Sequence, residues 1–294
     1  MQDNYFSERE LGLSPRNVEK IDKIFWEGFV ALIRSRTNDG SLAERFPLNC
    51  YDAPIPIGSD ESAIESAFRS EFPSMQWPLH LNDMPDTLSV LDAVEFFYRS
   101  ISKPIRKEYH SFFKHHHILS FDRDAGRQEY LNDVNRLFRR NSLAYELLED
   151  GQVIRLEPVV LRETLASATF RTEDQELNRL LELAREKLRD PDINVRREAV
   201  EKLWDAWERL KTLEPGTDKK KRIQALLTRA ISQLEFRDRV NREAIEITNI
   251  GNDFAIRHTE TNKIILAESE YLDYIFHRLF ALIQLLLRRT GRGG

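Results

Sequence analysis

The sequence predicts a mainly α-helical protein, in which an α+β, winged-helix-like module at residues 1–157 is followed by an α-helical bundle at residues 158–294. Three observations lead to this prediction. Apolar residues recur at helical spacing along most of the chain, and β-strand character is confined to residues 104–156. Every segment that follows residue 158 has the pattern of a helix.

Composition and charge narrow the class of protein. The chain has 294 residues, of which 41% are hydrophobic and 32% charged, an ordinary balance for one large or two medium folded domains. Its formal net charge of -5 means that any polyanion must be bound by a local cluster of basic residues. Cys50 is the only cysteine, which excludes an internal disulfide and favours a reducing compartment. The N-terminus does not resemble a secretion signal and no apolar stretch reaches 18 residues, so a cytoplasmic location without membrane association is expected.

The first module is expected to open with helices. Ser14 and Pro15 form an N-cap and N1 pair, and the apolar face that follows consists of Val18, Ile21, Phe25, Phe29 and Leu32. Residues 37–58 are rich in proline and glycine and are predicted to be a loop. Short helices are expected at residues 59–72 and 86–102, with an irregular, proline-rich segment between them.

A helix and a hairpin complete this module. Residues 125–140 form the helix, and residues 143–156 form a hairpin with Asp150-Gly151 as a two-residue turn. A helix that leads into a hairpin suggests a winged helix. Three basic residues occupy the position of its reading helix and are candidates for binding phosphate: Arg136, Arg139 and Arg140. Acidic residues interleave with them, so a solvated face of mixed charge is the alternative.

The segment "HSFFKHHH" at residues 110–117 contains four histidines in eight residues. Neutral imidazole is a good Zn²⁺ ligand. Adjacent histidines point apart, however, and neither a cysteine nor a carboxylate stands at a spacing that completes a tetrahedral set. The sequence therefore favours a surface loop, with no metal ligand and no cofactor.

The second part of the chain is expected to hold five helices beyond residue 171. Thr172 and Gln175 form a capping box for the first, which ends at Pro191. Trp204 and Trp207 on the next helix are expected to be core residues rather than a stacking platform for bases. The others are predicted at residues 218–234, 236–249 and 268–289.

Two features of these later helices bear on function. The chain is expected to break at Gly251, before the polar stretch around Arg257 and His258. The terminal helix, residues 268–289, is apolar on more than one side, so it is either central in the bundle or shared across a homodimer. The second option is favoured.

Three stretches carry a resemblance to a known family: "YFSERELG" at 5–12, "LNDVNRLFRRNSLAYELLEDGQVIRL" at 131–156, and "AVEKLWDAWERLKTLEPG" at 199–216 followed by "IGNDFAIRHTE" at 250–260. They resemble the AbiJ-type abortive-infection proteins of bacteria, which join an N-terminal module to a C-terminal helical domain of the HEPN kind. The resemblance implies anti-phage defence directed at RNA and a homodimer formed through the C-terminal bundle. It also leaves room for a second defence component.

The resemblance also implies a chemistry. HEPN ribonucleases need no metal: a histidine takes the proton from a ribose 2′-hydroxyl while an arginine holds the phosphate oxygens. In this chain the arginine is expected to be Arg257 and the general base His258 or His277, with Asn252 and Glu260 orienting the pair.

The sequence departs from the HEPN pattern in one respect. That pattern leaves four to six residues between the arginine and the histidine, and at this spacing from Arg257 the chain has Asn262, Lys263 and Ile264. Lys263 is instead expected to contact phosphate. The basic run at 218–222, with Lys219, Lys220 and Lys221, is a second candidate for phosphate binding, and a flexible exposed loop that opens a helix is its alternative.

Two other functions stay open at this level. The first is a non-catalytic dimerisation or interaction module, in which Arg257 and His258 belong to an ordinary polar turn. The second is a nucleic-acid-binding regulator that acts through the helix and hairpin at 125–156. The phosphate loop of nucleotide hydrolases, the serine-hydrolase elbow and the HExxH zinc motif are all absent from the sequence, which argues against those enzyme classes.

Overall fold

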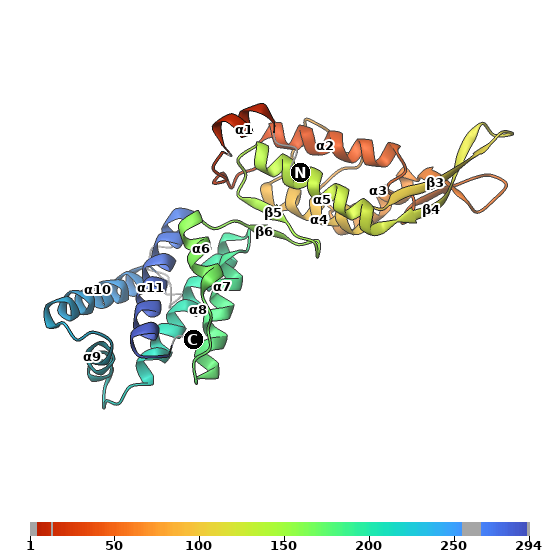
Figure 1. Cartoon of the computed structure of the whole chain (residues 1–294). Helices are drawn as coiled ribbons and strands as arrows, with labels where there is room; N and C mark the ends of the chain where they lie inside the picture. Colours follow the sequence, from red (N-terminus) through yellow and green to blue (C-terminus); the bar gives the residue numbers. More distant parts are fainter. Residues whose placement is uncertain (1–4, 13, 255–265, 293–294) are drawn as a thin grey trace. The chain divides into compact units, whose positions relative to one another are not determined.

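The structure is a computed structural model that describes residues 5–12, 14–254 and 266–292. The chain divides into two compact units, residues 1–156 and residues 157–294, and each unit has its own hydrophobic core (Figure 1). Helices make up most of the described part, and the strands pair into small two-stranded sheets, so the predicted mainly α fold is confirmed.

The first unit combines helices with three antiparallel hairpins. Its elements are α1 (Phe6–Leu11), α2 (Lys23–Asn38), β1 (Pro47–Asn49), β2 (Pro56–Ser59), α3 (Glu61–Glu71), α4 (Thr87–Ser100), β3 (Lys103–His110), β4 (His115–Asp122), α5 (Arg123–Arg140), β5 (Tyr145–Leu147) and β6 (Val153–Arg155). The hairpins pair β1 with β2, β3 with β4, and β5 with β6. Helices α3 and α4 confirm the two short helices expected from the sequence.

Aromatic side chains from α2, α4 and α5 fill the core of the first unit. Phe25 of α2 stacks on Phe138 of α5 with ring centroids 5.0 Å apart. Tyr130 is fully buried, and its hydroxyl donates a hydrogen bond to the carbonyl oxygen of Val94 on α4 at 3.0 Å. Burial without such a partner would be costly for the hydroxyl, so this bond fixes α5 against α4.

The first long helix begins later than the sequence predicted. The N-cap of α2 is Asp22, whose Oδ1 accepts a hydrogen bond from the backbone N–H of Phe25 at 2.9 Å. The predicted start at Ser14-Pro15 is therefore wrong. The reason is tertiary: the backbone N–H of Val18 donates to the carbonyl oxygen of Ser142 at 3.0 Å, which holds this stretch extended beside the end of α5.

The hairpin after α5 is confirmed, but its turn is longer than two residues. The N–H of Leu148 donates to the carbonyl oxygen of Gln152, and the N–H of Gly151 donates back to Leu148. Gly151 has φ 87°, as in a type I turn closed by a glycine in the left-handed region. A Cβ atom at Gly151 would lie 2.5 Å from the ring of Tyr98, so the position also requires glycine for space. The winged-helix interpretation of α5, β5 and β6 stays a prediction.

One hairpin lies where the sequence predicted a loop, and a second contains the histidine-rich segment that was expected to be a surface loop. β1 lies within the predicted loop at residues 37–58, and β2 lies at its end. The strands have three and four residues, which is too short for a recognisable alternation of apolar and polar residues. The histidine-rich segment, expected to be a surface loop, is the end of a hairpin: His110 ends β3, residues 111–114 form the turn and His115 begins β4. In Figure 1 this β3–β4 hairpin projects beyond the helices of the first unit.

The second unit is helical throughout its described part. Its elements are α6 (Val159–Ser167), α7 (Gln175–Leu188), α8 (Ile193–Thr212), α9 (Lys219–Ala230), α10 (Leu234–Asp253) and α11 (Ser269–Arg289). α11 packs against α8, α9 and α10. The cap of α7 differs from the expected Thr172–Gln175 box: Asp174 accepts from the N–H of Leu177 at 2.7 Å, while Thr172 donates to Asn178.

Both tryptophans of α8, Trp204 and Trp207, are fully buried core residues, as predicted. The expected break at Gly251 is wrong, because α10 continues through this residue to Asp253. Gly251 is buried, and a Cβ atom there would lie only 2.2 Å from the ring of Trp204. The glycine therefore permits close packing of α10 on α8 and does not end the helix.

This contact predicts the effect of Gly251→Ala. An alanine in a helix interior usually stabilises by about 1 kcal/mol over glycine. Here the methyl group would collide with the ring of Trp204, so we expect a net loss of about 1–3 kcal/mol in the free energy of unfolding. Urea denaturation followed by circular dichroism measures it. Asn249→Ala, an exposed change on the same helix, is the control and should be neutral or slightly stabilising; equal stability of Gly251→Ala and the wild type would contradict the packing argument.

Candidate functional site

The structure places only part of the predicted catalytic set. Arg257, His258, Glu260 and Lys263 lie outside the described residues. Asn252 is exposed in the last turn of α10, and His277 is half-buried on α11. These two helices flank the segment that contains the other candidates.

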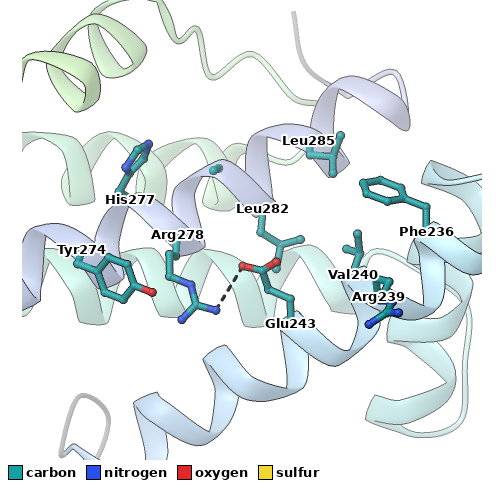
Figure 2. A pocket seen from close by; sticks show the side chains of 10 residues that line it. Phe236, Arg239, Val240, Glu243, Tyr274, His277, Arg278, Leu282 and Leu285 are labelled. Atoms are coloured by element: carbon teal, nitrogen blue, oxygen red, sulfur yellow. Dashed lines mark hydrogen bonds and ion pairs between the residues drawn. The ribbon is translucent and has the colours of Figure 1, made fainter.

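A pocket of about 400 Å³ lies between α10 and α11 (Figure 2). Its lining residues recur every three or four positions, so each helix presents one face. α10 supplies Phe236, Arg239, Val240 and Glu243, and α11 supplies Tyr274, His277, Arg278, Ala281, Leu282 and Leu285.

The pocket has an apolar floor and a polar, aromatic rim. Val240 and Leu282 are each 7% exposed and form part of the core, whereas the small side chain of Ala281 leaves space above them. Phe236 and Tyr274 are 50% and 58% exposed, so half of each aromatic side chain is open to solvent. An apolar base with a few polar groups around it is the usual composition of a ligand site.

One ion pair orders the rim. A guanidinium nitrogen of Arg278 lies 3.3 Å from a carboxylate oxygen of Glu243, which ties α11 to α10. The same guanidinium lies 5.4 Å from the ring centroid of Tyr274, a cation–π distance. Arg239 is exposed and has no hydrogen-bond or ion-pair partner in the part of the chain that the structure describes. Two arginines against one glutamate leave the rim net positive.

These groups suit binding better than proton transfer. Exposed aromatic rings and guanidinium groups are what single-stranded nucleic acids use for base stacking and phosphate contacts. Cleavage needs a base and a phosphate-binding cation at one point. Figure 2 shows the ring of His277 pointing away from the Arg278–Glu243 pair. The imidazole of His277 and the guanidinium of Arg278 therefore do not converge on one point.

The basic residues of α5 are engaged within the first unit. Arg136 pairs with Asp133 at 2.7 Å. Arg139 and Arg140 lie 3.4 and 3.7 Å from one carboxylate oxygen of Glu8 on α1, and that carboxylate side chain is 7% exposed. Arginines that hold α1 in this way are less available to phosphate than the sequence suggested.

The lysine run lies in the first turn of α9, where Lys219, Lys220 and Lys221 are all exposed. Lys219 is within 3.7 Å of a carboxylate oxygen of Glu208, and the ammonium of Lys221 donates to the hydroxyl of Thr217 at 3.2 Å. The sequence placed these lysines at the opening of the helix predicted at residues 218–234, and α9 begins there. Phosphate binding by these lysines stays a prediction.

The sequence reasoning missed Phe236, Arg239 and Tyr274 as members of a site. A signal was present, because both helices repeat aromatic and basic residues on the face that adjoins their buried face. In the first unit it also missed a group of residues able to hold a metal ion, formed by Cys50, His110, His115 and His117.

Comparison with known proteins adds a family match. The family model described as AbiJ N-terminal domain 4 matches residues 4–171, which covers α1 to α6. No curated protein and no solved structure matches the chain. None of the helices in the described part combines the length and hydropathy needed to cross a membrane.

The pairing of Glu8 predicts a pH-dependent attachment of α1. The hydrogen bond from the backbone N–H of Tyr5 lowers the pKa of Glu8 most, and the positive charges of Arg139 and Arg140 lower it further. Desolvation of the carboxyl opposes these effects, but the pKa stays below its ordinary value. The ionised carboxylate therefore stabilises the attachment of α1 at any pH above the pKa that Glu8 has in the unfolded chain. This stabilisation is lost as the pH falls through the lower pKa that Glu8 has in the folded chain. Amide hydrogen exchange within α1, corrected for its intrinsic pH dependence, should accelerate in that acidic range.

At neutral pH, Glu8→Gln should accelerate the same amides, whereas Glu10→Gln, an exposed change on the same helix, should not. Equal exchange in the two variants would show that the pairing does not hold α1.

Proposed function

The chain belongs to the AbiJ N-terminal domain 4 family, which indicates an abortive-infection type of defence protein, and on this premise we propose that its helical second unit binds RNA. The observation that supports RNA binding is the pocket between α10 and α11. Its rim combines two half-exposed aromatic rings with an exposed, unpartnered arginine among the described residues, Arg239.

Each of these groups has a role in the proposed complex. A base splayed from a single strand stacks on Tyr274, whose ring is already backed by the guanidinium of Arg278. Arg239 contacts a phosphate of the same strand. The glutamate of the rim, Glu243, is neutralised by Arg278 and so does not repel the backbone.

In the proposed mechanism this bundle is HEPN-like and cuts the RNA that it binds. α10 ends at Asp253 and α11 begins at Ser269, so the segment with Arg257 and His258 connects the two helices that line the pocket. Arg257 stabilises the phosphate as negative charge develops, and His258 removes the proton of the 2′-hydroxyl. His258, which directly follows Arg257 in the sequence, is the proposed base, and His277 on α11 is the alternative.

A second function is favoured by exposed apolar residues at the start of α10. Leu234 and Phe236 at the start of α10 are 59% and 50% exposed, and an amphipathic helix of another copy would cover them. In this alternative the second unit is a dimerisation module without catalytic activity.

The binding hypothesis predicts that Tyr274→Ala weakens the affinity for single-stranded RNA by about 5- to 150-fold, the value of one lost base stack. Arg239→Ala should reduce the salt dependence of binding by about one phosphate contact. Fluorescence anisotropy at several salt concentrations measures both.

Matched controls lie outside the pocket: Tyr271→Ala on α11 and Arg242→Ala on α10, both exposed. If the controls weaken binding as much as the pocket variants do, the pocket is not the binding site.

The cleavage hypothesis predicts that Arg257→Ala combined with His258→Ala abolishes phage protection or toxicity while the fold and RNA affinity persist. The wild type, incubated with total RNA in EDTA, should yield fragments that end in 2′,3′-cyclic phosphate. Full protection by the double variant excludes the catalytic role, and intact RNA together with a stable dimer supports the interaction module.

A further inference from the structure

Three histidines gather at the tip of the β3–β4 hairpin because of strand geometry. Side chains two residues apart on a strand share one face, so His115 and His117 lie together while His116 points to the other face. His110 is the register partner of His115 across the hairpin. Ring centroids of His110 and His117 are 4.7 Å apart, and those of His115 and His117 are 5.3 Å apart.

A cysteine from another hairpin completes the group. Cys50 follows β1, and its backbone N–H donates to the carbonyl oxygen of Ile55 at 2.9 Å, which closes the β1–β2 turn. The side chain is buried and reaches the histidines: its Sγ lies 3.2 Å from Nε2 of His115 and 3.9 Å from Nδ1 of His110. All four ligand atoms of Cys50, His110, His115 and His117 lie within 4.8 Å of one another.

We propose that these four side chains bind one Zn²⁺ ion. In a tetrahedral site with ordinary zinc bond lengths, sulfur and nitrogen ligands stand about 3.6 Å apart and two nitrogens about 3.4 Å apart. The two sulfur–nitrogen distances of 3.2 and 3.9 Å lie on either side of that value. A thiolate with three imidazoles selects zinc over magnesium or calcium, which prefer oxygen ligands.

An independent observation supports the ion. Nε2 of His117 is buried and has no hydrogen-bond partner among the residues that the structure describes. Buried polar atoms of this kind need an explanation, and coordination of a metal ion is one of the accepted ones. Metal coordination through the ring gives this histidine a partner that the surrounding protein groups do not supply.

A carboxylate lies behind two of the ligands. Oδ2 of Asp52 is 3.6 Å from Nε2 of His110, while the other ring nitrogen of His110 faces Cys50. A carboxylate on the second nitrogen of a histidine orients the ring and fixes its tautomer, as in many zinc sites. The thiol of Cys50 donates to Oδ1 of Asp52 at 2.8 Å; on zinc binding the sulfur–hydrogen bond breaks, the proton leaves to solvent, and the sulfur–zinc bond forms.

The ligand set indicates a structural role. Four protein ligands fill a tetrahedral shell and leave no position for a substrate or an activated water. The ion would join the β1–β2 turn to the tip of the β3–β4 hairpin, where Cys50 and His110 are 60 positions apart in the sequence. Phe113 stacks on His115 with centroids 5.8 Å apart and covers one side of the cluster.

The test is the metal content of the full-length protein purified without a histidine tag from zinc-supplemented medium. Elemental analysis should find about one zinc per chain. Cys50→Ser and His117→Ala should each retain almost none after dialysis, whereas His116→Ala, on the opposite face of the same strand, should retain the wild-type content. Asp52→Asn should weaken zinc binding about 10- to 100-fold.

Two measurements on the wild type guard against variants that do not fold. Removal of zinc with a strong chelator should lower the melting temperature, and added zinc should restore it. Replacement of zinc by cobalt(II) should give a sulfur-to-cobalt charge-transfer band, absent in Cys50→Ser. Protein that contains no zinc and takes up neither ion, or His116→Ala that loses the metal as completely as His117→Ala, would overturn the proposal.

Discussion

The width of the apolar surface of α11 determines the arrangement of the second unit. Phe280, Leu279 and Leu282 are 1%, 0% and 7% exposed, and their positions span more than one side of the helix. One neighbouring helix covers a single stripe, so burial of this surface requires several, and α8, α9 and α10 supply it. The sequence favoured an α11 shared with a second copy over a central one. Within the chain α11 contacts α8, α9 and α10, and the homodimer stays a prediction.

The pocket follows from that packing. Once the apolar sides of α11 are buried, the side that carries Tyr274, His277 and Arg278 is the one that remains beside α10. The ion pair between Arg278 and Glu243 joins the two helices at the rim and keeps the guanidinium against the ring of Tyr274. A rigid scaffold thus presents polar and aromatic groups around an apolar floor, which is how folds of very different families acquire binding sites.

Helical periodicity made much of this fold predictable, and long-range contacts made the rest unpredictable. The apolar repeats of α5 and α8 gave their buried faces, including Phe138 and Trp207. Helix starts were misplaced because the sequence offers more than one capping residue, and contacts with distant residues decide which of them caps the helix. At the start of α7, for example, Arg209 of α8 pairs with Asp174 at 2.7 Å and holds it in the N-cap position. The close packing of Gly251 on Trp204 could not be predicted from the sequence either, because the two residues are far apart in the chain.

The histidine cluster was missed because the sequence was not considered with the two-residue periodicity of a strand. Adjacent histidines do point apart, but a strand returns every second side chain to the same face, and the hairpin register adds a third ring. The fourth ligand comes from a turn that no local spacing could indicate. The tip of the hairpin also has few apolar contacts to hold it. Ile118, which is 3% exposed, is the buried residue of β4 nearest to the tip. Beyond it, Tyr109 and Phe112 are 56% and 80% exposed. Since an isolated hairpin is marginally stable and the hydrophobic core stops short of this tip, a metal ion is the kind of cross-link that would hold it.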